Sequence, residues 1–424
     1  MAEPVGTLAA MSQPIENLRA DGDRLWSALM AMAEIGKTEL GGCNRQALSD
    51  EDRRARDQFA QWAREIGCQI RVDEMGNVFA VRPGTEAEAP PVLIGSHLDT
   101  QPTGGRFDGV YGVLAGLEVL RVLADRQVDC RRTIEVVSWT NEEGSRFVPA
   151  MLGSGVVAAA HTLEFAYDRT DRDGHKFLDE LDRIGYRGSA PAQTRRLHAA
   201  FEAHIEQGPI LERTGTTIGV VTGIQGLEWL DVILDGVECH AGPTPMEDRR
   251  DPWRAACPII EGAFELAHRY SPWGRATIGD VRVKPGSRNT VPGQLSISVD
   301  LRHPQAVTLK QIVAEFHDLV ETSARRCNID FVVHPVWSMP ATVFDTRLVD
   351  LVESSASSLG YASRRIVSGA GHDSLHVAKF APTAMIFVPC AGGLSHNELE
   401  RAAPEDLEAG ANVLLRAVLA AANE

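Results

Sequence analysis

Hydrophobic and polar positions along the chain follow two different periods, and each period predicts a different kind of element. Residues 92–98 form a short apolar run that is typical of a buried strand, and apolar positions then recur at helical spacing from Val110 to Leu123. A second strand-like run follows at residues 133–139. A strand, a helix and a strand in this order form a βαβ unit, so we expect the two strands to be parallel neighbours.

The segment from 215 to 336 has a different pattern. A helix is predicted to open at Asp251–Pro252 and to bend at Pro258, and Thr308 with Gln311 predicts a capping box for another helix. Residues 294–302 alternate strictly between apolar and polar, which indicates an antiparallel strand with one buried face. The strand candidates are residues 229–235, 277–283, 294–302 and 330–333. The order βαββαβ predicts a small two-layer α+β domain.

After this segment the first pattern returns. A helix is predicted at 346–359, ended by Gly360, and an apolar strand at 383–388. We therefore predict an α/β fold whose larger catalytic domain has a mostly parallel sheet flanked by helices, with the small α+β domain inserted into it. The predicted parts are residues 1–214 and 337–424 for the catalytic domain and 215–336 for the inserted one. A chain of 424 residues is long enough for two such domains.

Charge and composition exclude several classes of function. The net charge of −16 provides no basic surface for nucleic acid, and an anionic membrane would repel it. No apolar run approaches the roughly 20 residues of a membrane span, and the N-terminus does not resemble a signal peptide. The seven cysteines are scattered without a CxxC pair, which favours reduced thiols. We expect a cytoplasmic protein whose partner is a small molecule.

Three histidines and two carboxylates lie in short segments rich in glycine and polar residues: His97, Asp108, Glu143, His204 and His396. Such a set can hold a pair of divalent cations, and nitrogen and oxygen ligands without thiolate suit zinc, manganese, cobalt or nickel alike. His97 and Glu143 follow predicted parallel strands, at the sheet edge where ligands bind. Glu142, beside Glu143, can then transfer a proton to and from a metal-activated water.

Taken alone, several of these segments have a second interpretation. The segments HIEQGP, with His204, and GLSHNE, with His396, are each also typical of a histidine that is hydrogen-bonded in the core. The segment GAGHDS at 369–374 predicts either an anion-binding loop or a tight turn in which Asp373 caps His372. Asp99 is expected to accept the second ring N–H of His97 and so fix its tautomer.

Together, the ordered motifs resemble one family. The segments GSHLDTQPTGGRFDGVYG, TNEEGSRF, HIEQGP, HAGPTP, NTVPG, DLRH, GAGHDS and GLSHN are similar to those of hydantoinase/carbamoylase amidases, which are relatives of the aminoacylase-type metallopeptidases. The resemblance implies one metal on His97 and His204, and a second on Glu143 and His396. It also implies that Asp108 bridges both metals, that the Asp108–Gly109 peptide is cis, and that Glu142 is the general base and acid.

The resemblance also implies substrate-binding residues. These are Gln207, His240, Asn289, Arg302 and the glycine-rich segment Gly369, Ala370 and Gly371. Arg302 suits a carboxylate held by two hydrogen bonds, and His240 with Asn289 would polarise the carbamoyl oxygen during catalysis. The inserted domain is expected to act as a lid and to form a homodimer in which His240 reaches the partner's site.

The predicted function is hydrolysis of the ureido C–N bond of an N-carbamoyl-L-amino acid or N-carbamoyl-β-alanine, with two divalent metal ions per subunit. The products would be the amino acid, carbon dioxide and ammonia. Alternatives with the same fold are an allantoate or ureidoglycolate amidohydrolase, or an aminoacylase or dipeptidase. An alternative of another class is a catalytically silent metal-binding paralogue.

Overall fold

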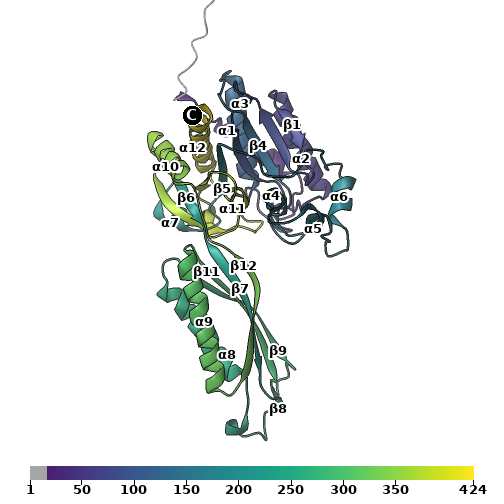
Figure 1. Cartoon of the computed structure of the whole chain (residues 1–424), viewed down its shortest axis with the longest axis vertical. Coiled ribbons are helices and arrows are strands. Elements are labelled where there is room, and N and C mark those ends of the chain that lie inside the picture. The colour runs from purple at the N-terminus through teal and green to yellow at the C-terminus, as the bar shows by residue number, and fades with distance from the viewer. Residues whose placement is uncertain (1–16) are drawn as a thin grey trace, which may run out of the picture. The chain divides into compact units, whose positions relative to one another are not determined.

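The computed structural model describes residues 17–424, which belong to two compact units. Unit 1 contains residues 17–222 together with Phe344–Glu424, and unit 2 contains Gly223–Val343 (Figure 1). The seven cysteines are free thiols, as expected. Among the described residues, no helix is both long enough and apolar enough to cross a membrane.

The main sheet has nine strands in the order β1-β2-β4-β3-β5-β15-β6-β13, in which β14 also pairs with β6. All of them belong to unit 1 except β13 and the last two residues of β6, which belong to unit 2. The strands are β1 (Gln69–Val72), β2 (Val78–Arg82), β3 (Val92–His97), β4 (Ile134–Trp139), β5 (Ala199–Ile205), β6 (Ile218–Ile224), β13 (Thr342–Val343), β14 (Ser363–Ser368) and β15 (Thr383–Val388). The neighbours β4, β3, β5 and β15 run parallel. The predicted parallel pairing of residues 92–98 with 133–139 is therefore confirmed.

Helices cover both faces of this parallel core. Ile94 of β3 faces α3, since a Cβ on Gly116 would lie 2.9 Å from the Ile94 side chain. Leu93 points the other way and packs in a cluster with Val377 of α11. Burial on both faces explains why these strands have continuous apolar runs. The helices of unit 1 are α1 (Gly22–Ala33), α2 (Asp50–Glu65), α3 (Val110–Asp125), α4 (Leu152–Val157), α5 (Leu163–Tyr167), α6 (Phe177–Arg183), α7 (Ile210–Thr214), α10 (Thr346–Ser358), α11 (Ser374–Val377), η3 (Ala391–Gly393) and α12 (Pro404–Asn423).

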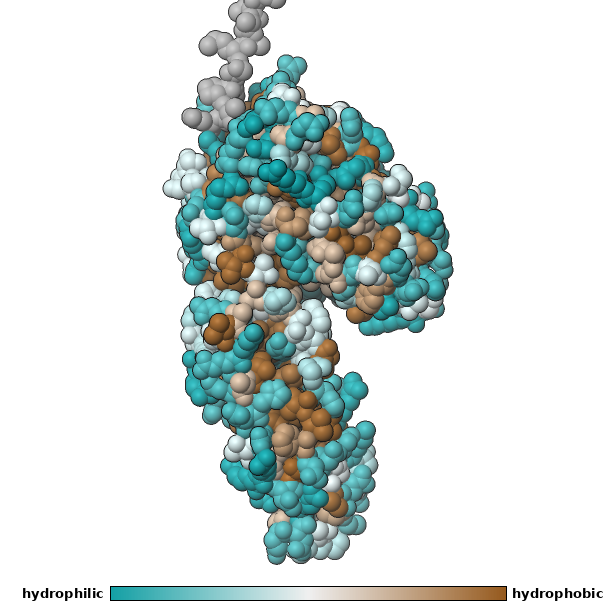
Figure 2. All heavy atoms as spheres, in the orientation of Figure 1, coloured by the Kyte–Doolittle hydropathy of each residue, from teal (hydrophilic) through white to brown (hydrophobic). Residues whose placement is uncertain are grey.

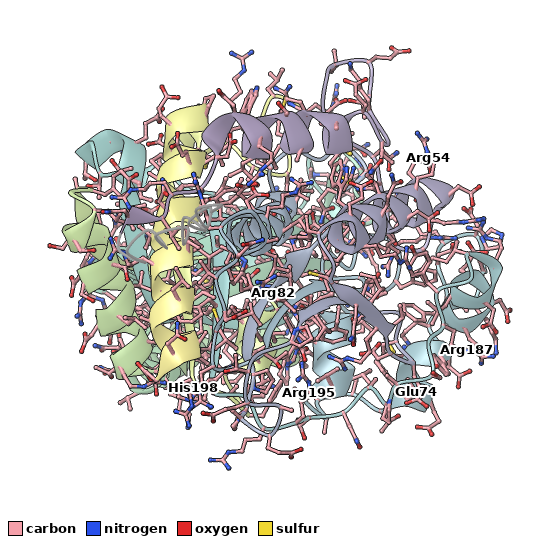
Figure 3. The ribbon with its side chains drawn as sticks, turned by 90° about the horizontal axis from the view of Figure 1, so that it is seen from above. Arg54, Glu74, Arg82, Arg187, Arg195 and His198 are labelled. Atoms are coloured by element: carbon pink, nitrogen blue, oxygen red, sulfur yellow. The ribbon has the colours of Figure 1, made fainter. Side chains whose placement is uncertain are left out.

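The amino end of the parallel core is tied to the terminal helix. His198, directly before β5, lies beside the end of α12 in Figure 3, and its Nε2 is 3.0 Å from Glu424 Oε2. Arg195 in the same segment forms an ion pair with Glu135 of β4. The opposite, carboxyl ends of these strands carry the candidate chemistry.

Unit 2 has a four-stranded antiparallel sheet with the order β12-β7-β11-β9 and a separate two-stranded ribbon of β8 and β10. Apart from the ribbon and a short 3-10 turn, its elements follow each other as βαββαβ. They are β7 (Gly226–Asp235), β8 (Cys239–His240), η2 (Met246–Asp248), α8 (Trp253–Arg269), β9 (Arg275–Lys284), β10 (Thr290–Val291), β11 (Gln294–His303), α9 (Ala306–Arg326) and β12 (Asp330–Met339).

The sheet of unit 2 has one covered and one open face. Alternate residues of β11 are buried, as the sequence predicted, and they form a core with the apolar sides of α8 and α9. On the open face, the rings of Trp229 and Trp337 are 5.0 Å apart and each residue is 40% exposed. Figure 2 shows hydrophobic residues gathered along the middle of this unit.

Two local expectations in unit 2 need correction or refinement. The helix α9 begins at Ala306, before the predicted capping box, and the Thr308 hydroxyl donates to the Gln305 side chain. The helix α8 continues past Pro258. Proline cannot donate to the carbonyl one turn earlier, that of Arg254, and the Cys327 thiol donates to this carbonyl instead, at 3.3 Å.

Candidate metal centre

The candidate ligands lie at the carboxyl ends of adjacent parallel strands in unit 1. His97 ends β3, Glu142 and Glu143 follow β4, His204 is near the end of β5, and His396 follows β15 and η3. Because these four strands are parallel neighbours, their carboxyl ends meet at one edge of the sheet. This strand order is the physical reason that His204 and His396 come close to His97.

Asp108 lies between two groups of candidate ligands, just before α3. Its Oδ1 is 3.2 Å from His204 Nε2 and 3.7 Å from His97 Nε2. Its Oδ2 is 3.3 Å from His396 Nε2, which is itself 3.4 Å from Glu143 Oε2. Each group provides three ligand atoms close enough to share a metal ion, and Asp108 belongs to both.

Backbone carbonyls orient the two buried imidazoles. The Nδ1 of His97 is 2.9 Å from the Asp99 carbonyl oxygen, and the Nδ1 of His204 is 2.9 Å from the Ile205 carbonyl oxygen. A carbonyl only accepts, so each Nδ1 carries a proton and donates it. The Nε2 atoms therefore face Asp108 in the orientation that a metal ligand needs.

Asp99 accepts the second ring N–H of His97, as expected, but through its backbone carbonyl, while its carboxylate Oδ1 is 3.9 Å from His97 Nδ1. The two Asp99 carboxylate oxygens accept the backbone N–H groups of Glu142 and Glu143, each at 3.2 Å. The Asp99 side chain thus holds the segment after β4, while its carbonyl group holds the His97 ring. One residue orients candidate ligands from two strands.

The electrostatics of the cluster favour a cation. Burial alone would lower the pKa of His204, but its hydrogen bond to Asp108, together with the negative charges of Asp108 and Glu202, outweighs burial and raises the pKa to about 9. The hydrogen bond to Asp108 also raises the pKa of His396 to about 9. Burial would raise the pKa of Asp108, yet the hydrogen bonds from both imidazoles hold it well below its usual range. Positive charge between these atoms is therefore stabilised.

The two glutamates after β4 differ in their contacts. Burial, followed by the charges of Asp373 and Glu143, raises the pKa of Glu142 well above its usual range. Its Oε2 is 3.4 Å from His97 Nε2. Burial and the charge of Asp108 raise the pKa of Glu143 to about 8, although Gln101 donates to both Glu143 oxygens, at 3.1 and 2.7 Å.

The residues present fit a pair of divalent cations. Several carboxylates are buried together, which costs free energy unless positive charge lies among them. The donor atoms are imidazole nitrogens and carboxylate oxygens without thiolate, a set that suits first-row divalent metals.

A glycine with positive φ shapes the turn after Asp108. Gly109 has φ of +66°, and a Cβ there would lie 2.3 Å from the His97 ring. The expected cis Asp108–Gly109 peptide is wrong, because the cis bonds among residues 17–424 precede Pro149, Pro272 and Pro285. The left-handed conformation of Gly109 turns the chain within a trans peptide, whereas a cis bond at a non-proline residue costs about 3 kcal/mol.

A model of the peptidase family M20/M25/M40 matches residues 93–420. The chain belongs to this family. It is 48% identical over 413 residues to an N-carbamoyl-L-amino-acid amidohydrolase from Rhizobium meliloti, covering 96% of this chain and 98% of the relative. It is 32% identical over 385 residues to an allantoate amidohydrolase from Bacillus subtilis, covering 90% and 93%.

A solved hydantoinase/carbamoylase family amidase from Burkholderia multivorans superimposes with a TM-score of 0.93 at 50% identity. The match covers 96% of this chain and 99% of that one. The resemblance inferred from the motifs is therefore confirmed, and with it the mixed α/β fold with a large sheet flanked by helices.

In this M20/M25/M40 member, Gln207 lies at the candidate metal centre. It adopts φ of +56°, and its Nε2 donates to Asp108 Oδ2 at 2.8 Å. Its Oε1 is buried and has no hydrogen-bond partner among the described residues. An acceptor buried without a partner is costly, so a donor from a bound molecule would be favourable there.

The other expected substrate residues, apart from the glycine-rich segment, lie in unit 2. The ribbon brings His240 next to Asn289, since His240 pairs with Thr290 and the Ala241 N–H donates to the Asn289 carbonyl at 2.9 Å. Both His240 and Asn289 are exposed. Arg302 is not part of this ribbon: it lies on the open face of β11.

The Arg302 guanidinium donates to both oxygens of Asp300. Its Nε is 2.9 and 3.0 Å from them, and its Nη2 is 2.7 Å from Oδ2. The two residues lie on the same face of one strand, so Asp300 orients the guanidinium.

The glycine-rich segment of Gly369, Ala370 and Gly371 connects β14 to α11 in unit 1. The Ala370 N–H donates to the Ser368 hydroxyl at 3.1 Å, and this hydroxyl is 3.0 Å from His372 Nε2. The His372 ring centroid is 4.5 Å from that of His204. Asp373 does not cap His372, because its carboxylate accepts from the Ser154 hydroxyl.

The sequence did not predict that Gln101, Ser395 and Glu400 contact the candidate ligands, and it placed His372 only in an anion-binding loop or a tight turn. Gln101 is in the DTQP segment after Asp99, and Ser395 and Glu400 flank His396. Their closeness to known motifs was the only available signal, because hydrogen bonds between segments so far apart in sequence leave no periodic pattern.

Proposed function

We propose that this protein is a metal-dependent amidohydrolase that cleaves the ureido C–N bond of an N-carbamoyl amino acid. Water would be consumed and the amino acid, carbon dioxide and ammonia released. The observation that carries the proposal is Asp108, whose two carboxylate oxygens face two different groups of ligand atoms. The relatives named N-carbamoyl-L-amino-acid amidohydrolase support the substrate class.

In this proposal, His97 and His204 hold one divalent ion, Glu143 and His396 hold the other, and Asp108 bridges them. Zinc, manganese, cobalt and nickel all suit these donors. When bound, such ions lower the pKa of a water molecule and polarise a carbonyl oxygen. Glu142 accepts the proton of the attacking water and later gives it to the leaving nitrogen, a role that its buried position beside His97 supports.

The remaining residues would bind the substrate. Arg302 binds the carboxylate through its planar guanidinium, which Asp300 already orients. The buried Gln207 Oε1 accepts an N–H of the ureido group. His240 and Asn289 polarise the carbamoyl oxygen. The segment Gly369, Ala370 and Gly371 contributes backbone contacts.

We further propose that unit 2 is an inserted lid and dimerisation domain, and that its closure excludes water from the reaction. The protein would be a cytoplasmic homodimer in which His240 reaches the partner's site. Sedimentation of the purified protein tests the dimer, and a monomer at micromolar concentration would contradict it.

Ammonia release tests the reaction. The metal-reconstituted protein is assayed with N-carbamoyl-L-amino acids, N-carbamoyl-β-alanine, allantoate and N-acetyl amino acids, the last by release of acetate. We expect the highest kcat/KM for an N-carbamoyl amino acid. A preference for allantoate would support an allantoate amidohydrolase instead, and a preference for N-acetyl substrates would support an aminoacylase. No turnover of any substrate with metal added would indicate a silent metal-binding paralogue.

A further inference from the structure

Glu400 is a fully buried carboxylate between His396 and the start of α12. Neither the sequence motifs nor the proposed reaction uses it. Burying a carboxylate is costly unless hydrogen bonds compensate for the loss of water. Its partners therefore indicate what it stabilises.

The first partners of Glu400 are two successive backbone N–H groups. Its Oε1 accepts from Phe107 N at 2.8 Å and from Asp108 N at 3.2 Å. These two N–H groups lie on either side of the Phe107 Cα, so one carboxylate oxygen fixes the backbone from Phe107 to Asp108. The direction in which the Asp108 side chain leaves the chain is therefore set by Glu400.

A second connection runs through a side chain. The Ser395 hydroxyl is 3.0 Å from Glu400 Oε2 and 2.9 Å from Asp108 Oδ2. Its single proton is donated to one carboxylate at a time, so the hydroxyl connects the two groups without bridging both at once. Glu400 thus contacts Asp108 directly at the backbone and, through Ser395, at the carboxylate.

The loop before Asp108, which contains Gly104 and Gly105, leaves space for Glu400. A Cβ on Gly105 would lie 2.0 Å from Glu400 Oε1, so any larger residue would displace the carboxylate. Gly105 does not have positive φ, unlike Gly109. The glycine at 105 is therefore required for close approach and not for an unusual backbone conformation.

We propose that Glu400 is a positioning residue that fixes Asp108 and thereby preorganises both metal positions at once. The inference rests on the dinuclear centre proposed above. Asp108 is shared by both ligand groups, so a small displacement would lengthen bonds to both ions. Residues that orient metal ligands are typically worth about 10–100-fold in metal affinity.

The test compares metal affinity in variants of the full-length protein, measured with Mn²⁺ and Zn²⁺ against a competing chelator. Glu400→Leu keeps much of the volume but removes every acceptor, and we expect about 10–100-fold weaker binding of both ions. Glu400→Gln keeps one oxygen for the two N–H groups and should give an intermediate loss. Gly105→Ala, which displaces Glu400 from the other side, should reproduce the defect.

Glu398→Gln is the matched control, because this carboxyl lies in the same segment and has no hydrogen bond to Asp108. Its affinity should equal that of the wild type. Melting temperatures of the metal-free proteins are measured alongside, since a purely structural role would lower them without changing the affinity of the folded fraction.

Wild-type affinity in folded Glu400→Leu would overturn this inference alone. If that variant does not fold, wild-type affinity in both Glu400→Gln and Gly105→Ala would overturn it. Absence of metal binding by the wild-type protein itself would overturn the proposed dinuclear centre together with this inference.

Discussion

The two sides of Asp108 have similar ligand chemistry in very different surroundings. On the Oδ1 side, the His97 and His204 side chains are 2% and 1% exposed, and backbone carbonyls orient both. On the Oδ2 side, the His396 side chain is 51% exposed and its backbone has φ of +52°. Strands carry the first pair of ligands, and loop residues carry the second.

From this difference we expect the two proposed metal positions to have separable tasks. Buried ligands on strands lose little entropy when they bind an ion, because the fold has already fixed them. An exposed ligand leaves room for water or a substrate atom beside the ion, as a catalytic metal site requires. We therefore expect tighter binding on the Oδ1 side and easier exchange on the Oδ2 side.

The largest effect should come from a residue that belongs to neither ligand group. Glu142→Gln should retain both ions but lower kcat by about 10²–10⁴-fold, because the amide cannot accept the proton. Ammonia release and metal content are measured on the same preparation. Loss of one ion together with activity would instead make Glu142 a ligand of that side.

Asp108→Ala should weaken metal binding on both the Oδ1 side and the Oδ2 side. We expect each affinity to fall by more than about 100-fold, since a shared ligand should matter more than a residue that merely orients one. Chelator competition monitored by metal analysis checks this. Retention of one tightly bound ion would show that Asp108 does not bridge.

The sides should also differ in their contribution to the fold. His204→Ala removes a buried ring that packs near His372 and Phe387, and should lower the free energy of unfolding of the metal-free protein by about 1–3 kcal/mol. His396→Ala, at a side chain that is 51% exposed, should lower it by less than His204→Ala does. Urea unfolding with excess chelator measures both values. Equal losses would contradict the contrast in burial.

The smallest effect is expected from a residue that contacts a candidate ligand only on the Oδ2 side of Asp108. Gln101→Leu removes the side-chain hydrogen bond to Glu143 Oε2. We expect the affinity for the ion on the Oδ2 side of Asp108 to fall by up to about 10-fold. Titration with Co²⁺, followed by its absorption spectrum, resolves the two binding steps. A matched loss in both steps would show that the sides are coupled more tightly than their geometry indicates.

The sequence predicted those features that rest on periodic patterns. The parallel β3 and β4, the edge that joins His97 to Glu143, and the alternating β11 all follow from the spacing of apolar residues. Placing His204 and His396 at that edge depended on the family resemblance, since nothing periodic in the sequence reveals that β5 lies beside β3 and β15 beside β5.

Local motifs predicted some hydrogen-bond partners but not the atoms that they use. Asp99 accepts from the His97 ring as expected, but through its carbonyl, because its carboxylate accepts from the backbone N–H groups of Glu142 and Glu143. Thr308 and Gln311 have capping-box spacing, yet the helix begins earlier, at Ala306. A local sequence motif indicates which hydrogen bonds are possible, and the tertiary structure determines which of them form.

The thiol of Cys327 has a consequence for handling the protein. It donates its proton to the Arg254 carbonyl, the group that Pro258 leaves without a partner inside α8. Oxidation of this partly exposed sulfur to a sulfinate would replace the donor with negatively charged oxygens facing that carbonyl. Preparations aged in air or peroxide should therefore lose stability first in unit 2, while the candidate metal ligands, none of which is a cysteine, stay intact.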